Sequence, residues 1–260
     1  MTAPTGFTAS PAGYAVLSHG DALAHLAQRQ SVFADLLATA ALDAPVPTCP
    51  GWTVTALAHH LGTVHRWAAG AVRDGRPDER EETGPTDRDG LVAWYGEGAH
   101  ELTALLTATD EAAEVWSFGP KPRTARFWSR RQAHETAMHT EDLGLAAGAM
   151  PPLPADLALD GVDEVVTMFF PRQVHLGRTP PLERSLALVP DGASRWVLAG
   201  DGTTPSDDAL PADATLAGPA EVLVRLLWQR VTLDEALAAG LRLDGDEAAA
   251  RAVLGARLTP

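Results

Sequence analysis

The stretch RQAHETAMHTEDLG, residues 131–144, places a glutamate and a histidine four residues apart, at Glu135 and His139. On a helix this spacing puts both side chains on one face, one turn apart. A carboxylate and an imidazole held in this way form half of a site for a divalent metal ion. The other protein ligand must then come from elsewhere in the chain, as happens when facing helices of a bundle share a site.

Spacing alone leaves two interpretations of this stretch open. Glu135 and His139 form either a metal half-site or an ordinary exposed helix pair. Asp142 either orients a ligand histidine or is a last-turn carboxylate beside Gly144. The metalloprotease motif H-E-x-x-H is excluded, because His134 and His139 are five residues apart and lie on different faces of a helix.

Three further helices precede this one in the sequence. Their hydrophobic periodicity predicts them at residues 18–42, 54–73 and 90–107, and the helix with Glu135 begins near Thr124. Thr53 follows a Pro-Gly turn and is the expected N-cap of the second helix. The inner face of the fourth helix is expected to carry Trp128, Arg131, Glu135, Met138, His139, Asp142 and Leu145.

The second helix offers three histidines as the missing ligand. His60 lies on the apolar stripe, whereas His59 projects with the polar side chains and His65 lies on a flank. Periodicity therefore points His60 most directly inward and selects it as the third ligand; the alternative is a buried, hydrogen-bonded histidine. The stripe itself consists of Leu57, Leu61, Val64, Ala68 and Ala71.

A proline-rich boundary, AAGAMPPLP at residues 146–154, separates this helical half from a half of different texture. We expect a flexible arm at residues 1–17, a four-helix metal-binding bundle at 18–148 and a smaller α+β domain with a mostly antiparallel sheet at 155–260. In the last domain the patterns predict helices at 155–170 and 219–230, strands at 185–189, 195–198 and 213–216, an edge strand in LRLDGD and a terminal helix in EAAARAVLGARL.

Composition excludes several classes of protein. The net charge of −14 argues against a nucleic-acid surface, and no apolar run is long enough to span a bilayer. The N-terminus lacks the basic and apolar regions of a secretion signal, so we expect a cytoplasmic, soluble protein. The sequence contains no G-x-S-x-G, G-x-G-x-x-G, P-loop or EF-hand motif.

Two residues outside the helix pair have competing interpretations. The single cysteine, Cys49, lies in a stiff turn without a neighbouring basic residue, which favours a packed, inert thiol over a nucleophile. Arg230 ends an apolar helix, where capping of the helix dipole is favoured over binding of a carboxylate. Trp67, Trp94 and Trp128 either line a pocket or, as we favour, pack in the core.

Three motifs together resemble the mycothiol-dependent maleylpyruvate isomerase family. They are VPTCPGWTVTALAHHL at residues 46–61, W-x-x-R-x-x-H-E-x-x-x-H-x-x-D-L-G at 128–144, and DATLAGP followed by LLWQR at 213–219 and 226–230. The resemblance covers residues 18–258. It implies a DinB-like four-helix bundle joined to a C-terminal α+β domain like that of sterol carrier proteins.

The resemblance also implies a site. The metal ligands of the family fall on His60, Glu135 and His139, and its functional arginine falls on Arg230, which would hold the carboxylate of the substrate. One divalent ion, Zn²⁺, and the thiol mycothiol as co-substrate are implied, although histidine and carboxylate ligands also suit Ni²⁺, Fe²⁺ or Mn²⁺.

These expectations favour a metal-dependent, mycothiol-using isomerase or S-transferase that acts on a small electrophilic substrate bearing a carboxylate. Two alternatives remain: a non-catalytic metal- or ligand-binding protein on the same scaffold, and a metal-dependent hydrolase. We expect a monomer or homodimer with no nucleic-acid or membrane partner. The sequence does not specify the substrate.

Overall fold

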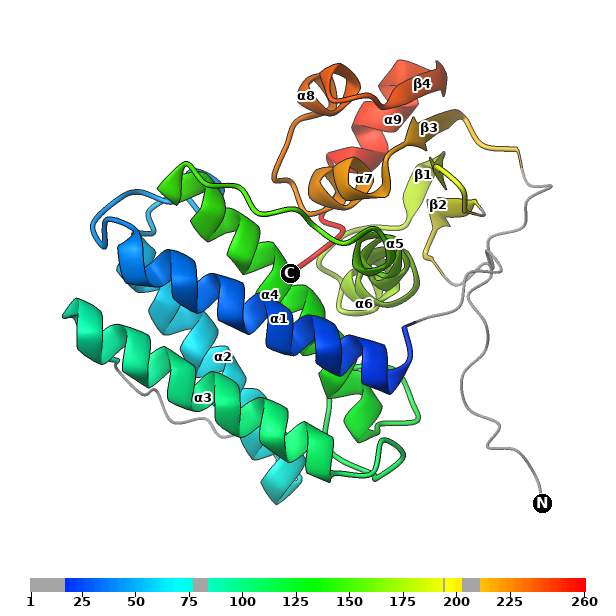
Figure 1. Cartoon of the computed structure of the whole chain (residues 1–260). Helices are drawn as coiled ribbons and strands as arrows, with labels where there is room; N and C mark the ends of the chain where they lie inside the picture. The colour runs from blue at the N-terminus through cyan, green and yellow to red at the C-terminus, as the bar shows by residue number, and fades with distance from the viewer. Residues whose placement is uncertain (1–16, 77–83, 194, 203–210) are drawn as a thin grey trace. The chain divides into compact units, whose positions relative to one another are not determined.

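The computed structural model describes residues 17–76, 84–193, 195–202 and 211–260 (Figure 1). Residues 1–16 of the expected N-terminal arm and part of the charged loop that follows the second helix lie outside the described residues. The last residue assigned to the arm, Leu17, is buried, and its carbonyl accepts a hydrogen bond from Arg126 Nη2. The described chain divides into two compact units, Leu17–Pro152 and Leu153–Pro260.

The first unit is the predicted bundle of four helices. They are α1 (His19–Thr39), α2 (Val54–Asp74), α3 (Arg88–Ala108) and α4 (Ala125–Ala147), which confirms the helices that periodicity predicted. Helices α1 and α2 each pack against both α3 and α4 (Figure 1). The contact between α2 and α4 brings His60 of one helix to Glu135 of the other.

The core of the bundle is apolar and contains residues from all four helices. Buried side chains contribute roughly 1.5–3 kcal/mol each relative to exposed ones, so this cluster supplies much of the stability of the unit. Its largest members are Phe33 and Leu37 from α1, Leu57 and Leu61 from α2, Leu91 and Tyr95 from α3 and Leu143 from α4.

The segment between α1 and α2 is fixed by its own backbone. Val46 donates its N–H to the Trp52 carbonyl at 2.9 Å, and Trp52 donates to the Cys49 carbonyl at 3.0 Å. Gly51 adopts a φ of 85°, a conformation that favours glycine, which explains the Pro-Gly pair at this turn. Thr53 then caps α2 as predicted, because its side chain accepts the backbone N–H of Ala56.

The expected inner face of α4 is correct except at one end. Leu145 is 42% exposed rather than inward-facing. It lies in the last turn of α4, where residues 145–150 are exposed apart from the half-buried Ala146. The apolar periodicity therefore continues past the point at which the other helices cover α4.

The second unit confirms the α+β prediction. Its strands, β1 (Leu182–Pro190), β2 (Trp196–Gly200), β3 (Ala214–Gly218) and β4 (Arg242–Gly245), form a sheet in the order β2-β1-β3-β4. The two outer pairs are antiparallel and the central β1–β3 pair is parallel. The helices are α5 (Ala155–Glu164), η1 (Val165–Phe169), α6 (Phe170–His175), α7 (Ala220–Leu227), α8 (Leu233–Ala238) and α9 (Glu247–Leu254).

Two helices of this unit differ from the prediction. The helix expected to end at residue 170 continues through a π-helical turn, η1, to His175. Helix α8 was not predicted, because its six residues are too few to show a helical period. Its start is fixed instead by a capping box between Thr232 and Glu235. No helix among the described residues is both long enough and apolar enough to cross a membrane.

The capping bond of Thr53 provides a stability prediction with a matched control. Thr53→Ala should lower the free energy of unfolding by about 1 kcal/mol, because the N–H of Ala56 loses its acceptor. Thr124→Ala should cost less, since Thr124 occupies the same position before α4 but makes no side-chain capping bond. Denaturant unfolding followed by circular dichroism measures both variants, and equal losses would contradict the role of the capping bond.

Candidate metal centre

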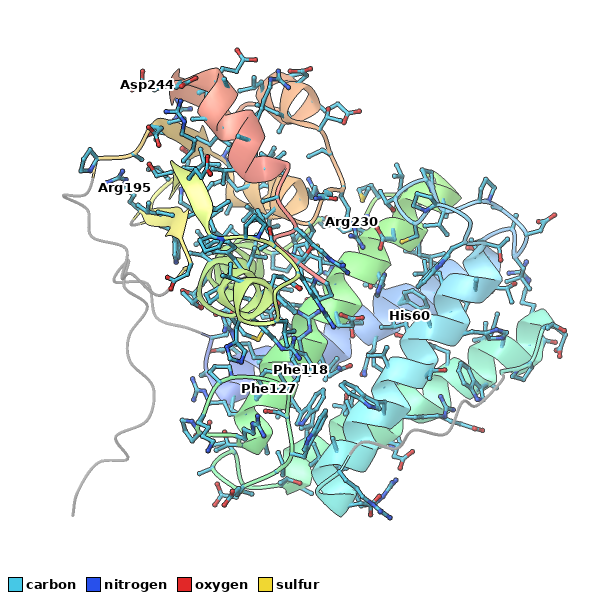
Figure 2. The ribbon with its side chains drawn as sticks, turned by 180° about the vertical axis from the view of Figure 1, so that it is seen from behind. His60, Phe118, Phe127, Arg195, Arg230 and Asp244 are labelled. Atoms are coloured by element: carbon cyan, nitrogen blue, oxygen red, sulfur yellow. The ribbon has the colours of Figure 1, made fainter. Side chains whose placement is uncertain are left out.

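The structure brings the three predicted ligands together between α2 and α4. His60 Nε2 lies 3.4 Å from Glu135 Oε1, and His139 Nε2 lies 3.3 Å from the same oxygen. The two imidazole rings are 4.9 Å apart at an interplanar angle of 80°. One ligand atom from each residue lies within 4.8 Å of the others, so the three side chains, hereafter the triad, form a group able to hold a metal ion. Figure 2 labels His60 on α2.

The two oxygens of Glu135 have different partners. Oε2 accepts a hydrogen bond from Arg131 Nη2, one turn earlier on α4, which leaves Oε1 to the two histidines. Burial raises the pKa of the Glu135 carboxyl, but the charge of Arg131 and hydrogen bonds from His139 and His60 outweigh burial and hold the pKa well below its usual range. The carboxylate is therefore ionised and oriented as a ligand requires.

His139 is oriented by the carboxylate of Asp142. Its Nδ1 lies 2.9 Å from Asp142 Oδ2, so its Nε2 faces Glu135. Burial lowers the pKa of His139, but hydrogen bonds to Asp142, Cys49 and Glu135 outweigh it and raise the pKa well above its usual range. Thr48 donates its hydroxyl to the other oxygen of Asp142 at 2.6 Å. Asp142 thus has the orienting role that the sequence left open.

Cys49 belongs to this same support. Its Sγ lies 3.6 Å from Asp142 Oδ2, and Cys49, His139 and Asp142 form a second group with ligand atoms close together. The two groups share His139, whose Nδ1 is already bonded to Asp142. We interpret the second group as the support of the triad rather than as a separate ion site. The expected packing of Cys49 against the core is observed.

Trp52 forms an aromatic wall beside the triad. Its ring centroid lies 4.8 Å from that of His60 and 6.3 Å from that of His139, and it stacks on His139 at 25°. The backbone N–H and carbonyl of Trp52 both take part in the hydrogen bonds of the turn before α2, which positions this residue beside the triad. Sequence reasoning did not identify Trp52, because no periodicity describes a loop.

The prediction that His60 points further inward than the other two histidines of α2 is only partly correct. His60 does reach Glu135, but its side chain is 36% exposed, whereas His65 is fully buried. His65 Nε2 lies 3.0 Å from Thr136 Oγ1, and its ring lies beside Tyr95 of α3. Because α2 packs against two helices, its buried face is wider than one stripe. Burial lowers the pKa of His65 to about 3, so this histidine is neutral.

Arg230 belongs to the C-terminal unit, and its binding of a substrate carboxylate stays a prediction. It follows α7, and its Nη1 donates to the Trp228 carbonyl at 2.9 Å, as the capping interpretation requires. It also lines a pocket of about 380 Å³ together with Thr232, Glu235 and Arg251.

The donor set fits a divalent ion. Two imidazole nitrogens and a carboxylate oxygen suit Zn²⁺ and several transition metals, and three protein ligands leave a position for another molecule. The side chains of Glu135 and His139 are only 19% and 11% exposed, whereas that of His60 is 36% exposed. Solvent therefore reaches the triad on the side of His60. The roles of Arg131 and Asp142 follow from their spacing of four and three residues from the ligands that they contact.

Comparison with known proteins gives consistent results for both halves of the chain. A family model described as the mycothiol maleylpyruvate isomerase N-terminal domain matches residues 21–144. The MDMPI C-terminal domain model matches residues 156–252. A search of the curated proteins gives no match to this chain.

Two solved structures have the same fold. One is the crystal structure of the mycothiol-dependent maleylpyruvate isomerase, with a TM-score of 0.57 and 16% sequence identity over 81% of this chain and 88% of that chain. The other is a histidine-to-alanine mutant of that enzyme, with a TM-score of 0.56 and 15% identity over the same shares.

The charges in the triad predict a pH dependence of stability in metal-free protein. A lowered pKa of Glu135 contributes stability above the usual value of 4.5, which is lost as the pH falls through the folded pKa. A raised pKa of His139 contributes stability below 6.5, which is lost as the pH rises through its folded pKa. The contribution of the pair is therefore largest between pH 4.5 and 6.5.

Thermal unfolding in chelator across this range tests the prediction. Glu135→Gln should lower the Tm most between pH 4.5 and 6.5, and less on either side. Glu101→Gln is the control, because it breaks an exposed ion pair with Arg73 whose loss costs about 0–1 kcal/mol. A Tm difference for Glu135→Gln that is flat with pH would contradict the ion pair.

Proposed function

The chain belongs to the mycothiol maleylpyruvate isomerase family, and on this basis we propose that it is a metal-dependent enzyme that uses mycothiol to isomerise or S-conjugate a small electrophile bearing a carboxylate. The observation that carries the proposal is the convergence of His60, Glu135 and His139 on one point of the bundle. An ionised carboxylate held with two imidazoles at a partly exposed site, with pKa values shifted by specific neighbours, is typical of functional sites.

The three ligands would hold one divalent ion, for which we favour Zn²⁺ because its sites combine nitrogen and oxygen donors in this number. Such an ion supplies the acidity that converts a thiol into its thiolate near neutral pH. Arg131 keeps Glu135 ionised. Asp142 accepts the proton of His139 Nδ1 in a hydrogen bond, so that the lone pair of Nε2 can bind the ion. The ring of Trp52 contacts both imidazoles from the side of the loop.

The proposed reaction needs no oxidant or reductant. The thiolate sulfur adds to one carbon of an activated double bond, and the electron pair moves into the adjacent carbonyl as an enolate. Rotation about the resulting single bond followed by loss of the thiolate gives the isomer. Capture of the enolate by a proton instead gives the stable conjugate. Both outcomes need the substrate to be held by a group that does not react.

We assign that holding role to Arg230. A guanidinium binds a carboxylate through two parallel hydrogen bonds, which fixes both position and orientation. The bond from Nη1 to Trp228 orients the side chain, and the residue lines a pocket. The family resemblance, in which LLWQR carries the functional arginine, supports this role over capping alone.

Metal content tests the assigned ligands. Protein purified without chelator should contain one ion per chain, and His60→Ala and Glu135→Ala should lose it. Loss of a residue that only supports a metal ligand lowers metal affinity roughly 10- to 100-fold. Loss of a ligand itself should lower the metal affinity of these two variants by at least as much. His59→Ala is the matched control, because this neighbouring histidine bonds to the Pro85 carbonyl instead. Mass spectrometry of the metal gives the result, and metal-free wild-type protein would overturn the proposal.

Turnover tests the reaction class. Mycothiol and a panel of unsaturated keto acids, followed by mass spectrometry, should reveal adducts or isomers that depend on metal. Arg230→Ala should raise the KM by about tenfold or more for substrates with a carboxylate, and Arg230→Lys should recover part of the loss. Bound metal without thiol consumption would indicate a binding protein, and turnover without thiol would indicate a hydrolase.

A further inference from the structure

Five aromatic side chains from α2, from α4 and from the segment between α3 and α4 pack together, away from the triad. We call Trp67, Trp116, Phe118, Phe127 and Trp128 the aromatic cluster. Trp67 contacts Trp128 at a centroid distance of 4.9 Å and lies nearly parallel to Phe118 at 6.1 Å. Phe118 and Phe127, labelled in Figure 2, are 5.0 Å apart. Trp128 is fully buried, whereas the other four residues are only partly buried.

Helical spacing places two members of the cluster, Trp67 and Trp128, on the same helix faces as His60 and Glu135. Trp67 is seven residues after His60 on α2, and Trp128 is seven residues before Glu135 on α4. Seven residues make two turns, which return the side chain to the same face about 10 Å along the axis. Both pairs, His60 with Glu135 and Trp67 with Trp128, are in contact. The two helices therefore present the triad at one level and aromatic rings at another.

The level between them is partly filled. Val64 of α2 is half-buried, and Arg131 of α4 is buried with its guanidinium on Glu135. The facing surfaces of α2 and α4 are thus polar at the triad and apolar at the aromatic cluster. A ligand that follows these surfaces from the triad would meet hydrocarbon rather than charge at its far end.

Core packing alone accounts for some of the tryptophans. Trp128 is fully buried and its Nε1 donates to the Trp116 carbonyl at 2.7 Å. Trp94 lies on α3 and stacks under the guanidinium of Arg66 at 4.1 Å. Trp67 differs from Trp94 in that it lies on the face of α2 that carries His60, and it stacks on Phe118, with both residues only partly buried. Ligand sites combine such apolar surface with a few polar groups.

We propose that Trp67 and Phe118 bind the flat, apolar end of the electrophilic substrate, about 10 Å from the carbon that reacts with the thiol. This inference rests on the proposed function and names its substrate class, an electrophile with an aryl group at the end of a short chain. An aryl group packs against these rings by offset stacking or edge contact and loses apolar surface to water.

A matched pair of substrates tests the inference on the metal-loaded, full-length protein. Both are unsaturated keto acids, R–CO–CH=CH–CO₂⁻, with R either methyl or phenylbutyl. Mycothiol adds to each across the double bond, with sulfur on one carbon and the thiol proton on the other. The kcat/KM for the phenylbutyl acid should exceed that for the methyl acid by about tenfold or more.

Variants locate the preference. Trp67→Ala and Phe118→Ala should each lower the ratio of the two kcat/KM values several-fold, and Trp67→Phe should retain most of it. Trp94→Phe is the control, since this tryptophan lies on α3, and it should leave the ratio as in the wild type. An equal kcat/KM for both acids, or an equal loss for both in Trp67→Ala, would overturn the inference while the proposed function stands.

Binding without chemistry separates the two proposals. The saturated acids, R–CO–CH₂–CH₂–CO₂⁻, accept no thiol, and titration calorimetry gives their Kd. The phenylbutyl acid should bind about tenfold more tightly, and Phe118→Ala should remove this advantage even if Trp67→Ala proves unstable. If neither unsaturated acid consumes thiol but the binding preference holds, the proposed function fails and the aromatic subsite remains. Equal Kd values for the two saturated acids would overturn the subsite.

Discussion

The ion pair between Arg131 and Glu135 is the interaction on which the candidate site depends. A carboxylate that is only 19% exposed loses much of its hydration, and without a partner it would take up a proton. Arg131 compensates from the preceding turn of the same helix, so the pair forms wherever α4 forms. One oxygen is thereby occupied, and the other is presented to both histidines. The geometry of the ligand set thus follows from helix geometry.

The segment before α2 orients the histidines of the triad. Thr48 and Cys49 contact the two oxygens of Asp142, and Asp142 fixes the ring of His139. The turn that places them also places Trp52 over the imidazoles. A short, backbone-bonded loop therefore orients groups on both helices. This explains why proline and glycine occur together at a position where a longer loop would leave these side chains free to move.

Much of the fold and the proximity of the three triad side chains could be predicted, because both follow from helix periodicity. Four-residue spacing gave Glu135 and His139, and the apolar stripe gave His60. The same rule misjudged His65, because it treats a helix as having one buried face, whereas α2 has two neighbours. Trp52 could not be predicted, since its position depends on loop hydrogen bonds. Helix α8 was missed because a cap, not a period, defines it.

The triad and the aromatic cluster lie two helical turns apart, so the residues proposed to hold the metal differ from those proposed to contact the far end of the substrate. Each side chain of the triad has its partners within one turn of α4 or in the adjoining loop. None of those contacts passes through Trp67 or Phe118. Substitutions two turns away therefore alter the surface that meets the far end of a substrate while the ligand set stays in place. A bundle of parallel and antiparallel helices can in this way retain one reactive centre and change what it acts on.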